Sequence, residues 1–160
     1  MTARIQPLVA LLALTCTTAA ATDEPVELAN RHIALRFDPA DGYALSSLVH
    51  RAHNVEFIGP RPEGLKQDRA LWAIQVRGPN LMQTLTPADA RHAGHTLSGE
   101  TLTITWGGIA NETVPGDLTV TVSVRLPHDS PKAYWRAKVS GALQGWLWQL
   151  DFPRVVGIRD

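Results

Sequence analysis

The chain has 160 residues, of which 15 are Lys or Arg and 15 are Asp or Glu, so its formal net charge at pH 7 is +0. This balance argues against the strongly basic surface of proteins that bind nucleic acid or anionic lipid, and we expect neither nucleic acid nor a membrane as a partner. The single cysteine, Cys16, excludes an intrachain disulfide and a cysteine-rich metal site.

Residues 1–21 have the pattern of a secretory signal peptide. Arg4 precedes a short apolar run, and the small residues Ala19-Ala20-Ala21 follow it, as signal peptidase requires. The run is shorter than the roughly 20 residues of a membrane span. We therefore expect a secreted or periplasmic protein that begins near Thr22, with residues 22–160 forming one β-sandwich domain.

After the signal, short apolar-periodic runs alternate with clusters of turn residues, which is typical of an antiparallel β-sandwich. Residues 38–42 (Asp-Pro-Ala-Asp-Gly) form the first predicted turn. The polar stretch at 81–94 contains a proline and is compatible with a short helix. The strands that we expect lie at residues 33–37, 43–49, 54–58, 71–76, 102–106, 118–126, 134–140 and 145–152.

The strongest strand signal lies in the second half of the chain. From Leu118 to Leu126, aliphatic residues alternate with Thr, Ser and Arg. Leu102, Ile104 and Trp106 alternate with threonines in the same way. Successive residues of a strand point to opposite faces, so each of these strands has one apolar face for a core. Residues 107–116 are predicted to form the loop between them.

These patterns predict an all-β fold, an antiparallel β-sandwich of the supersandwich type. Residues 150–158 are still apolar and strand-like close to the C-terminus. They are either a C-terminal edge strand or a sign that the chain is the first part of a longer domain. We expect the longer domain, whose sheet this chain leaves incomplete at its C-terminal side.

Histidine and carboxylate residues are the candidates for chemistry. Two His-x-x-His pairs occur, His50/His53 and His92/His95. Residues three apart on a strand point to opposite faces, and a metal site needs three or four converging ligands, so we predict no metal and no cofactor. In a loop, His92 and His95 would converge near Glu100, which is the alternative. No Gly-x-Ser-x-Gly elbow and no phosphate-binding glycine loop occurs, so we assign no catalytic residue.

Tryptophan is the remaining candidate for binding. Trp146 and Trp148 point to one face if their segment is extended, and aromatic faces stack on sugar rings. Burying a tryptophan gains roughly 4–6 kcal/mol of transfer free energy, which favours the core for this pair over an exposed platform. Trp146 and Trp148 are nevertheless the carbohydrate-binding candidates of this chain.

The order of features resembles a known family. Asn30, the apolar-periodic strand at 32–37 and the segment from Gly42 to Leu48 are similar to the start of galactose-mutarotase-like β-sandwiches. The segment Leu150-Asp151-Phe152-Pro153 is similar to a strand end midway through those sandwiches. Such sandwiches often stand at the N-terminus of secreted α-galactosidase-like glycoside hydrolases, ahead of a (β/α)8 barrel.

The resemblance implies a fold and a carbohydrate context, and no activity. The family's sandwich is longer than this chain, which would hold its first half or somewhat more. The barrel that supplies the catalytic acids would be a partner domain. A mutarotase needs a His acid and a Glu base facing the sugar, and no motif here assigns them.

Three functions follow as hypotheses. The first is the non-catalytic N-terminal β-sandwich portion of a secreted, glycoside hydrolase-like protein, packed against its barrel. The second is a free-standing carbohydrate-binding module, which uses Trp146 and Trp148. The third is a small sugar-epimerising or hydrolysing enzyme, which requires His92, His95 and Glu100 to converge.

Overall fold

The computed structural model describes residues 24–59, 69–78 and 82–158. The predicted signal peptide, with Cys16, and most of the predicted loop at 59–64 lie outside these residues. Within them the chain is all-β, with eleven strands arranged in three antiparallel sheets, which confirms the predicted fold class. No helix in these ranges is long and apolar enough to cross a bilayer.

The first sheet has the order β1-β2-β3-β4 and comes from the N-terminal part of the domain. Its central strands are buried at the positions that the period-two pattern predicts, including Leu35 and Phe37. The strands are β1 (Val26–Ala29), β2 (Ile33–Asp38), β3 (Ala44–His50) and β4 (Val55–Glu56).

The predicted turn at 38–42 is a 3-10 turn, η1 (Pro39–Asp41), between β2 and β3. The Asp38 carboxylate accepts a hydrogen bond of 3.0 Å from the N–H of Ala40. Gly42 ends the turn with a left-handed φ of 62°, a conformation that glycine adopts without steric cost. The turn directs the chain back along β2.

The second sheet has the order β10-β9-β8-β7 and is built from long strands. The aliphatic residues from Leu118 to Leu126 are all buried, as predicted. The prediction that the loop begins at residue 107 was wrong, because β8 continues to Ile109 across a register shift in which Gly108 has a φ of 65°. The strands are β7 (His92–Ser98), β8 (Thr101–Ile109), β9 (Gly116–Arg125) and β10 (Tyr134–Leu143).

The third sheet has the order β11-β5-β6 and joins segments from distant parts of the chain. β5 (Ala73–Arg77) and β6 (Met82–Leu85) form a hairpin, and β11 (Trp146–Asp151) pairs with the free side of β5. The uncertain stretch at 81–94 therefore contains β6 and the start of β7, and its helical part is one 3-10 turn, η3 (Pro87–Asp89).

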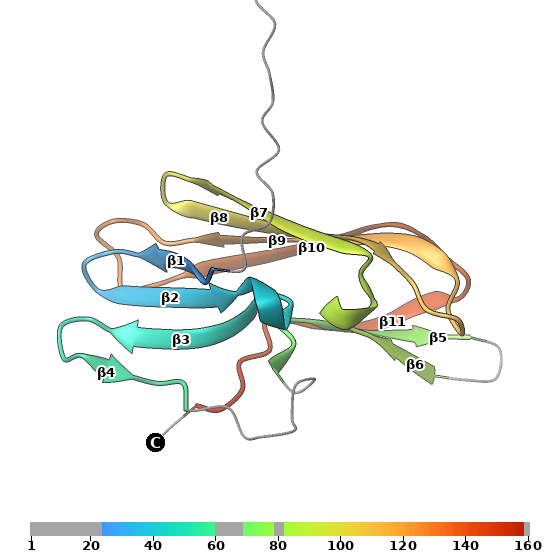
Figure 1. The fold of residues 1–160 in the computed structure, drawn as a ribbon, viewed down its shortest axis with the longest axis horizontal. Helices are drawn as coiled ribbons and strands as arrows, with labels where there is room; N and C mark the ends of the chain where they lie inside the picture. The colour runs from blue at the N-terminus through green and yellow to red at the C-terminus, as the bar shows by residue number, and fades with distance from the viewer. Residues whose placement is uncertain (1–23, 60–68, 79–81, 159–160) are drawn as a thin grey trace, which may run out of the picture.

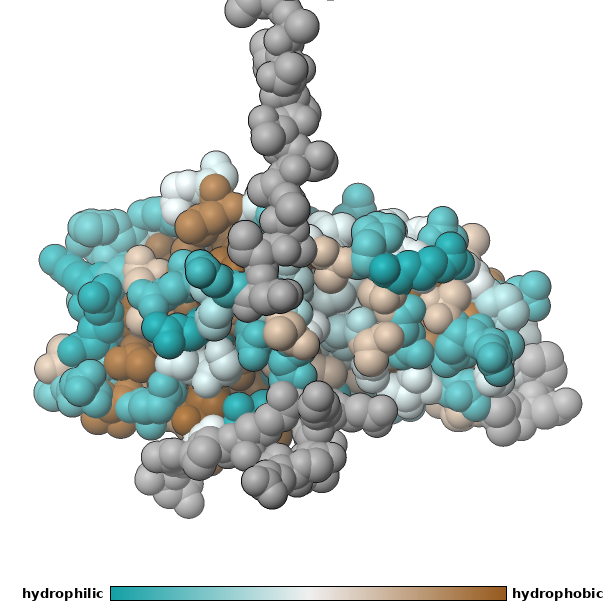
Figure 2. Space-filling model, viewed as in Figure 1, coloured by the Kyte–Doolittle hydropathy of each residue, from teal (hydrophilic) through white to brown (hydrophobic). Residues whose placement is uncertain are grey.

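The three sheets form two layers (Figure 1). The long sheet β7–β10 extends along the molecule, and the sheets β1–β4 and β11-β5-β6 lie next to each other against it. In the space-filling view of Figure 2, hydrophilic residues cover most of the visible face, and the hydrophobic areas are separate patches. The buried hydrophobic residues form one cluster, to which strands of all three sheets contribute.

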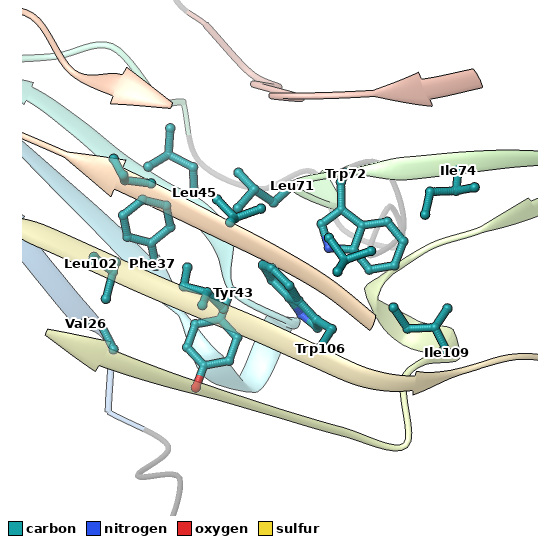
Figure 3. Close-up of a cluster of buried hydrophobic side chains, with 14 of the residues drawn as sticks. Val26, Phe37, Tyr43, Leu45, Leu71, Trp72, Ile74, Leu102, Trp106 and Ile109 are labelled. Atoms are coloured by element: carbon teal, nitrogen blue, oxygen red, sulfur yellow. The ribbon is translucent and has the colours of Figure 1, made fainter. Parts of the chain in front are cut away.

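Trp106 stands where the three sheets meet (Figure 3). Its indole is fully buried and packs edge-on against Tyr43 and Trp72, with ring centroids 5.9 and 5.8 Å away. Its Nε1–H donates a hydrogen bond of 3.3 Å to the carbonyl oxygen of Gly42. The prediction that Trp106 belongs to the core is confirmed, and one side chain on β8 contacts both smaller sheets.

Candidate functional site

The outer face of the sheet β11-β5-β6 carries exposed aromatic and basic side chains. Trp146 on β11 lies opposite Arg77 on β5, and Arg77 lies opposite Met82 on β6. Residues paired across a sheet share a face, so these side chains form one row across the three strands. All of them are exposed, whereas the neighbouring Val76 is buried on the opposite face.

A bulge adds Trp148 to this face. β11 and β5 pair regularly except between Leu147 and Gln149, where the register shifts and Trp148 has no partner residue on β5. The guanidinium carbon of Arg77 lies 5.2 Å from the centroid of the Trp148 ring, a cation–π contact. Trp148 therefore lies on the side of the sheet that Arg77 and Trp146 occupy.

Polar side chains continue the face along β11. Gln149 lies opposite Gln75, and Gln75 lies opposite Thr84. The Gln149 Nε2 donates a hydrogen bond of 2.5 Å to Asp151 Oδ1. We call this surface the tryptophan face; it is defined by Gln75, Arg77, Met82, Trp146, Trp148 and Gln149.

The expectation that Trp146 and Trp148 belong to the core was wrong. Their relative exposures are 67% and 59%. The inward positions of this sheet are occupied by Ile74, Val76 and Leu85, all of them buried, and the register turns the two tryptophans the other way. The prediction that both rings share one face is confirmed.

Arg77 and Met82 were not singled out from the sequence. They join the tryptophan face only because β11 pairs with β5 and β5 with β6. Neither residue lies in a motif, and β11, which carries the tryptophans, is distant in sequence from both β5 and β6. An alternation count along β5, which separates Gln75 and Arg77 from Ile74 and Val76, is the local signal that would have placed Arg77 on an outer face.

The histidine pairs do not form a common site. His50 and His53 stack on each other with ring centroids 4.9 Å apart. His92 and His95 lie on a strand, β7, and therefore point to opposite faces. No group of three or more potential metal ligands occurs among the residues that the structure describes.

The residues of the third hypothesis have separate partners. His95 Nδ1 lies 3.0 Å from the Tyr43 hydroxyl, and the ring of His92 lies beside Gly107 on β8. Glu100 Oε1 accepts a hydrogen bond of 2.6 Å from the N–H of His128. His92, His95 and Glu100 thus each contact a different part of the molecule. They do not form an acid–base pair that faces a common substrate site.

Tyr43 has a pKa that is clearly displaced. Burial raises the pKa of its phenol above the ordinary value. Its backbone has a left-handed φ of 63°, which is uncommon for a residue with a side chain. The phenol fills the core beside Trp106 and ends at His95, which is a structural position between two sheets.

Two hollows border the sandwich. One, with a volume of about 300 Å³, lies between η1 and η3, and its lining consists mostly of alanine, glycine and proline. The other, of about 400 Å³, lies between β10 and β11 and includes Leu118, Val139, Leu143 and Leu147. Neither is lined by a histidine, and the second reaches Leu147, which pairs with Val76 and so lies on the side of the sheet opposite the tryptophan face.

The chain was compared with protein-family models, with curated proteins and with solved structures, and none of the three comparisons found a match.

Proposed function

We propose that this protein is a non-catalytic β-sandwich of a secreted carbohydrate-active protein, and that its tryptophan face binds a glycan. The observation that supports the proposal is the pair of exposed indoles, Trp146 and Trp148, on one face beside Arg77. Each exposed indole forgoes roughly 2–4 kcal/mol of the transfer free energy that burial would supply. A sugar ring that stacks on the indoles recovers part of it.

The remaining side chains of the tryptophan face suit a sugar. A pyranose has apolar C–H faces and a rim of hydroxyl groups. The indoles offer flat apolar surfaces, while Arg77, Gln75 and Gln149 supply donors and acceptors at their edges. Few precisely placed polar groups around an aromatic surface are the usual composition of a small-ligand site.

The test is binding of the protein to a panel of immobilised neutral polysaccharides that includes glucans, xylan and galactomannan. We expect retention on at least one of them, and a loss of affinity of at least about tenfold in Trp146→Ala and in Trp148→Ala. Tyr134→Ala is the matched control, because Tyr134 is an exposed aromatic residue on a different sheet. Absence of binding on the whole panel, or equal losses in all three variants, would overturn the proposal.

The second candidate function is packing against a (β/α)8 catalytic domain. The hollow between β10 and β11 favours it, because it is partly apolar and ends at Leu147, which is 45% exposed. Co-elution of the protein with such a glycoside hydrolase domain tests it. Leu147→Asp is expected to abolish co-elution while Trp146→Ala preserves it; co-elution of both variants would contradict the packing role.

We also propose that the protein is exported, on the pattern of residues 1–21. N-terminal sequencing of the protein from the medium or the periplasm is expected to begin near Thr22. An unprocessed chain confined to the cytosolic fraction would contradict export.

A further inference from the structure

Three cations lie together on the outer face of the sheet β7–β10. Arg136 and Lys138 on β10 alternate with residues that pack against the core, so both point away from it. Arg125 ends β9 opposite Tyr134, and its guanidinium carbon lies 5.3 Å from the centroid of that ring. Residues two apart on a strand are about 6.7 Å apart and neighbouring strands about 4.8 Å, so Arg136 is a close neighbour of both Arg125 and Lys138, whereas Arg125 and Lys138 lie roughly 14 Å apart on the same face.

No carboxylate of the described residues forms an ion pair with Arg125, Arg136 or Lys138. Glu100 lies next to Arg125 across the sheet, and its carboxylate accepts a hydrogen bond from the N–H of His128. Asp117 shares β9 with Arg125 but stands near the opposite end of the strand. A local excess of positive charge thus exists in a chain whose total charge is +0.

Hydroxyl groups cover the neighbouring part of the same face. Thr or Ser occupies every second position of the first part of β8 and the middle of β9, and a threonine of β7 pairs with one of them; this pairing brings the side chains to the side of the sheet that carries the cations. None of them is fully buried. They are Thr96, Thr101, Thr103, Thr105, Thr119, Thr121 and Ser123.

We propose that this surface, the cationic face of Arg125, Arg136 and Lys138, binds an anionic polysaccharide through its sulfate, phosphate or carboxylate groups. Guanidinium groups pair with such oxyanions through two parallel hydrogen bonds, and an ammonium group adds a mobile point charge. The threonine and serine hydroxyls both donate and accept, as sugar hydroxyls do. A single-stranded nucleic acid stacks successive bases on several aromatic side chains, whereas Tyr134 is the one exposed aromatic residue of the described part of this face.

The cationic face is separate from the tryptophan face. It lies on the outer side of one layer of the sandwich, whereas the tryptophan face lies on the outer side of the other. The proposal therefore stands without the proposed function, and the two can fail independently. Trp146→Ala is expected to leave binding at the cationic face unchanged.

Dextran sulfate and neutral dextran are the probes, and affinity is measured by calorimetric titration of the protein. We expect binding of dextran sulfate only, with an affinity that falls at least about tenfold between about 50 and 200 mM salt, because bound counterions are released. Replacing Arg125, Arg136 and Lys138 together by Gln is expected to lower the affinity at least about tenfold. The matched control replaces Arg31, Arg36 and Lys132 by Gln, which removes the same charge elsewhere and is expected to change the affinity less than about twofold.

Each alternative outcome overturns the proposal. Equal losses in the two triple variants would mean that net charge alone drives binding. Tighter binding of a single-stranded oligonucleotide than of dextran sulfate would assign the face to nucleic acid. Unchanged binding in the Arg125/Arg136/Lys138 variant, with a native circular dichroism spectrum, would mean that these charges only protect the exposed edge strand β10 from pairing.

Discussion

The side-chain amide of Asn30 donates a hydrogen bond of 2.6 Å to the carbonyl oxygen of Pro127, which joins the turn after β1 to the turn after β9. The same Nδ2 donates to the carbonyl oxygen of Ser130 at 2.7 Å, while Oδ1 accepts from the N–H groups of His32 and Ile33 at 2.8 and 2.9 Å. Asn30 is buried, and its amide uses both donors and both acceptor positions.

Asn30→Asp is expected to destabilise the fold by roughly 2–6 kcal/mol, because a carboxylate would face two carbonyl oxygens that lose their donor. The free energy of unfolding in urea measures the loss. Asn111→Asp is the matched control: Asn111 Oδ1 accepts from the N–H groups of Thr113 and Val114, and a carboxylate keeps both bonds. Similar losses in the two variants would refute the special role of the Asn30 donors.

Trp106→Ala and Trp146→Ala are expected to differ sharply in stability. Trp106 is fully buried among three sheets, so its removal leaves a cavity and costs roughly 3–5 kcal/mol. Trp146 is exposed, and its removal is expected to change the free energy of unfolding by no more than about 0.5 kcal/mol. Thermal melting of both variants tests this, and a large loss in Trp146→Ala would place its ring in the core after all.

Gly141→Ala is expected to destabilise the β9–β10 pair by roughly 1–3 kcal/mol. Gly141 has a φ of 104°, and a Cβ at this position would lie 2.2 Å from the carbonyl oxygen of Asp117. Gly94→Ala is the control, because nothing lies within 4 Å of a Cβ there. Urea denaturation is expected to show a neutral or slightly stabilising effect for Gly94→Ala, and a matching loss in both variants would contradict the steric argument.

Tyr43→Phe is expected to change how stability depends on alkaline pH. Burial raises the pKa of Tyr43 in the folded state, so above pH about 10 the unfolded chain releases this proton first and is stabilised. The native protein therefore loses stability as pH rises through about 10 toward the folded pKa, and below that range the contribution of Tyr43 to stability is complete and independent of pH.

The comparison of the two proteins isolates this residue from other titrating groups. Near pH 8 the native protein is expected to be more stable than Tyr43→Phe by roughly 0.5–1.5 kcal/mol, because the variant lacks the hydrogen bond to His95. The advantage is expected to shrink above pH about 10. A difference that stays constant over this range would contradict ionisation of a buried Tyr43.

Local pattern was enough for the strands that supply the core. The alternation from Leu118 to Leu126 predicts both the strand and its buried face, since period-two patterning follows from strand geometry alone. The turn at 38–42 was predictable for a similar reason, because Asp38 and Gly42 satisfy local backbone requirements.

The outer faces could not be predicted in this way. Whether Trp146 packs inward or outward depends on its pairing with Arg77, and these two residues are 69 positions apart in the sequence (146 − 77). The bulge at Trp148 also has no signature in its neighbours. Hydrophobicity alone favours burial of both indole rings. In the structure Ile74 and Val76 fill the inward positions of this sheet, and the two rings are exposed on its other face.

The position of Trp106 has a consequence for how the molecule opens. Because one indole contacts residues from both smaller sheets and belongs to the long one, a sheet that separates from the others must expose part of this ring to water. Partial opening is then nearly as unfavourable as complete opening. Amide protons at the centres of β2, β5 and β8 should therefore exchange with deuterium at a common rate, as members of a single cooperative unit.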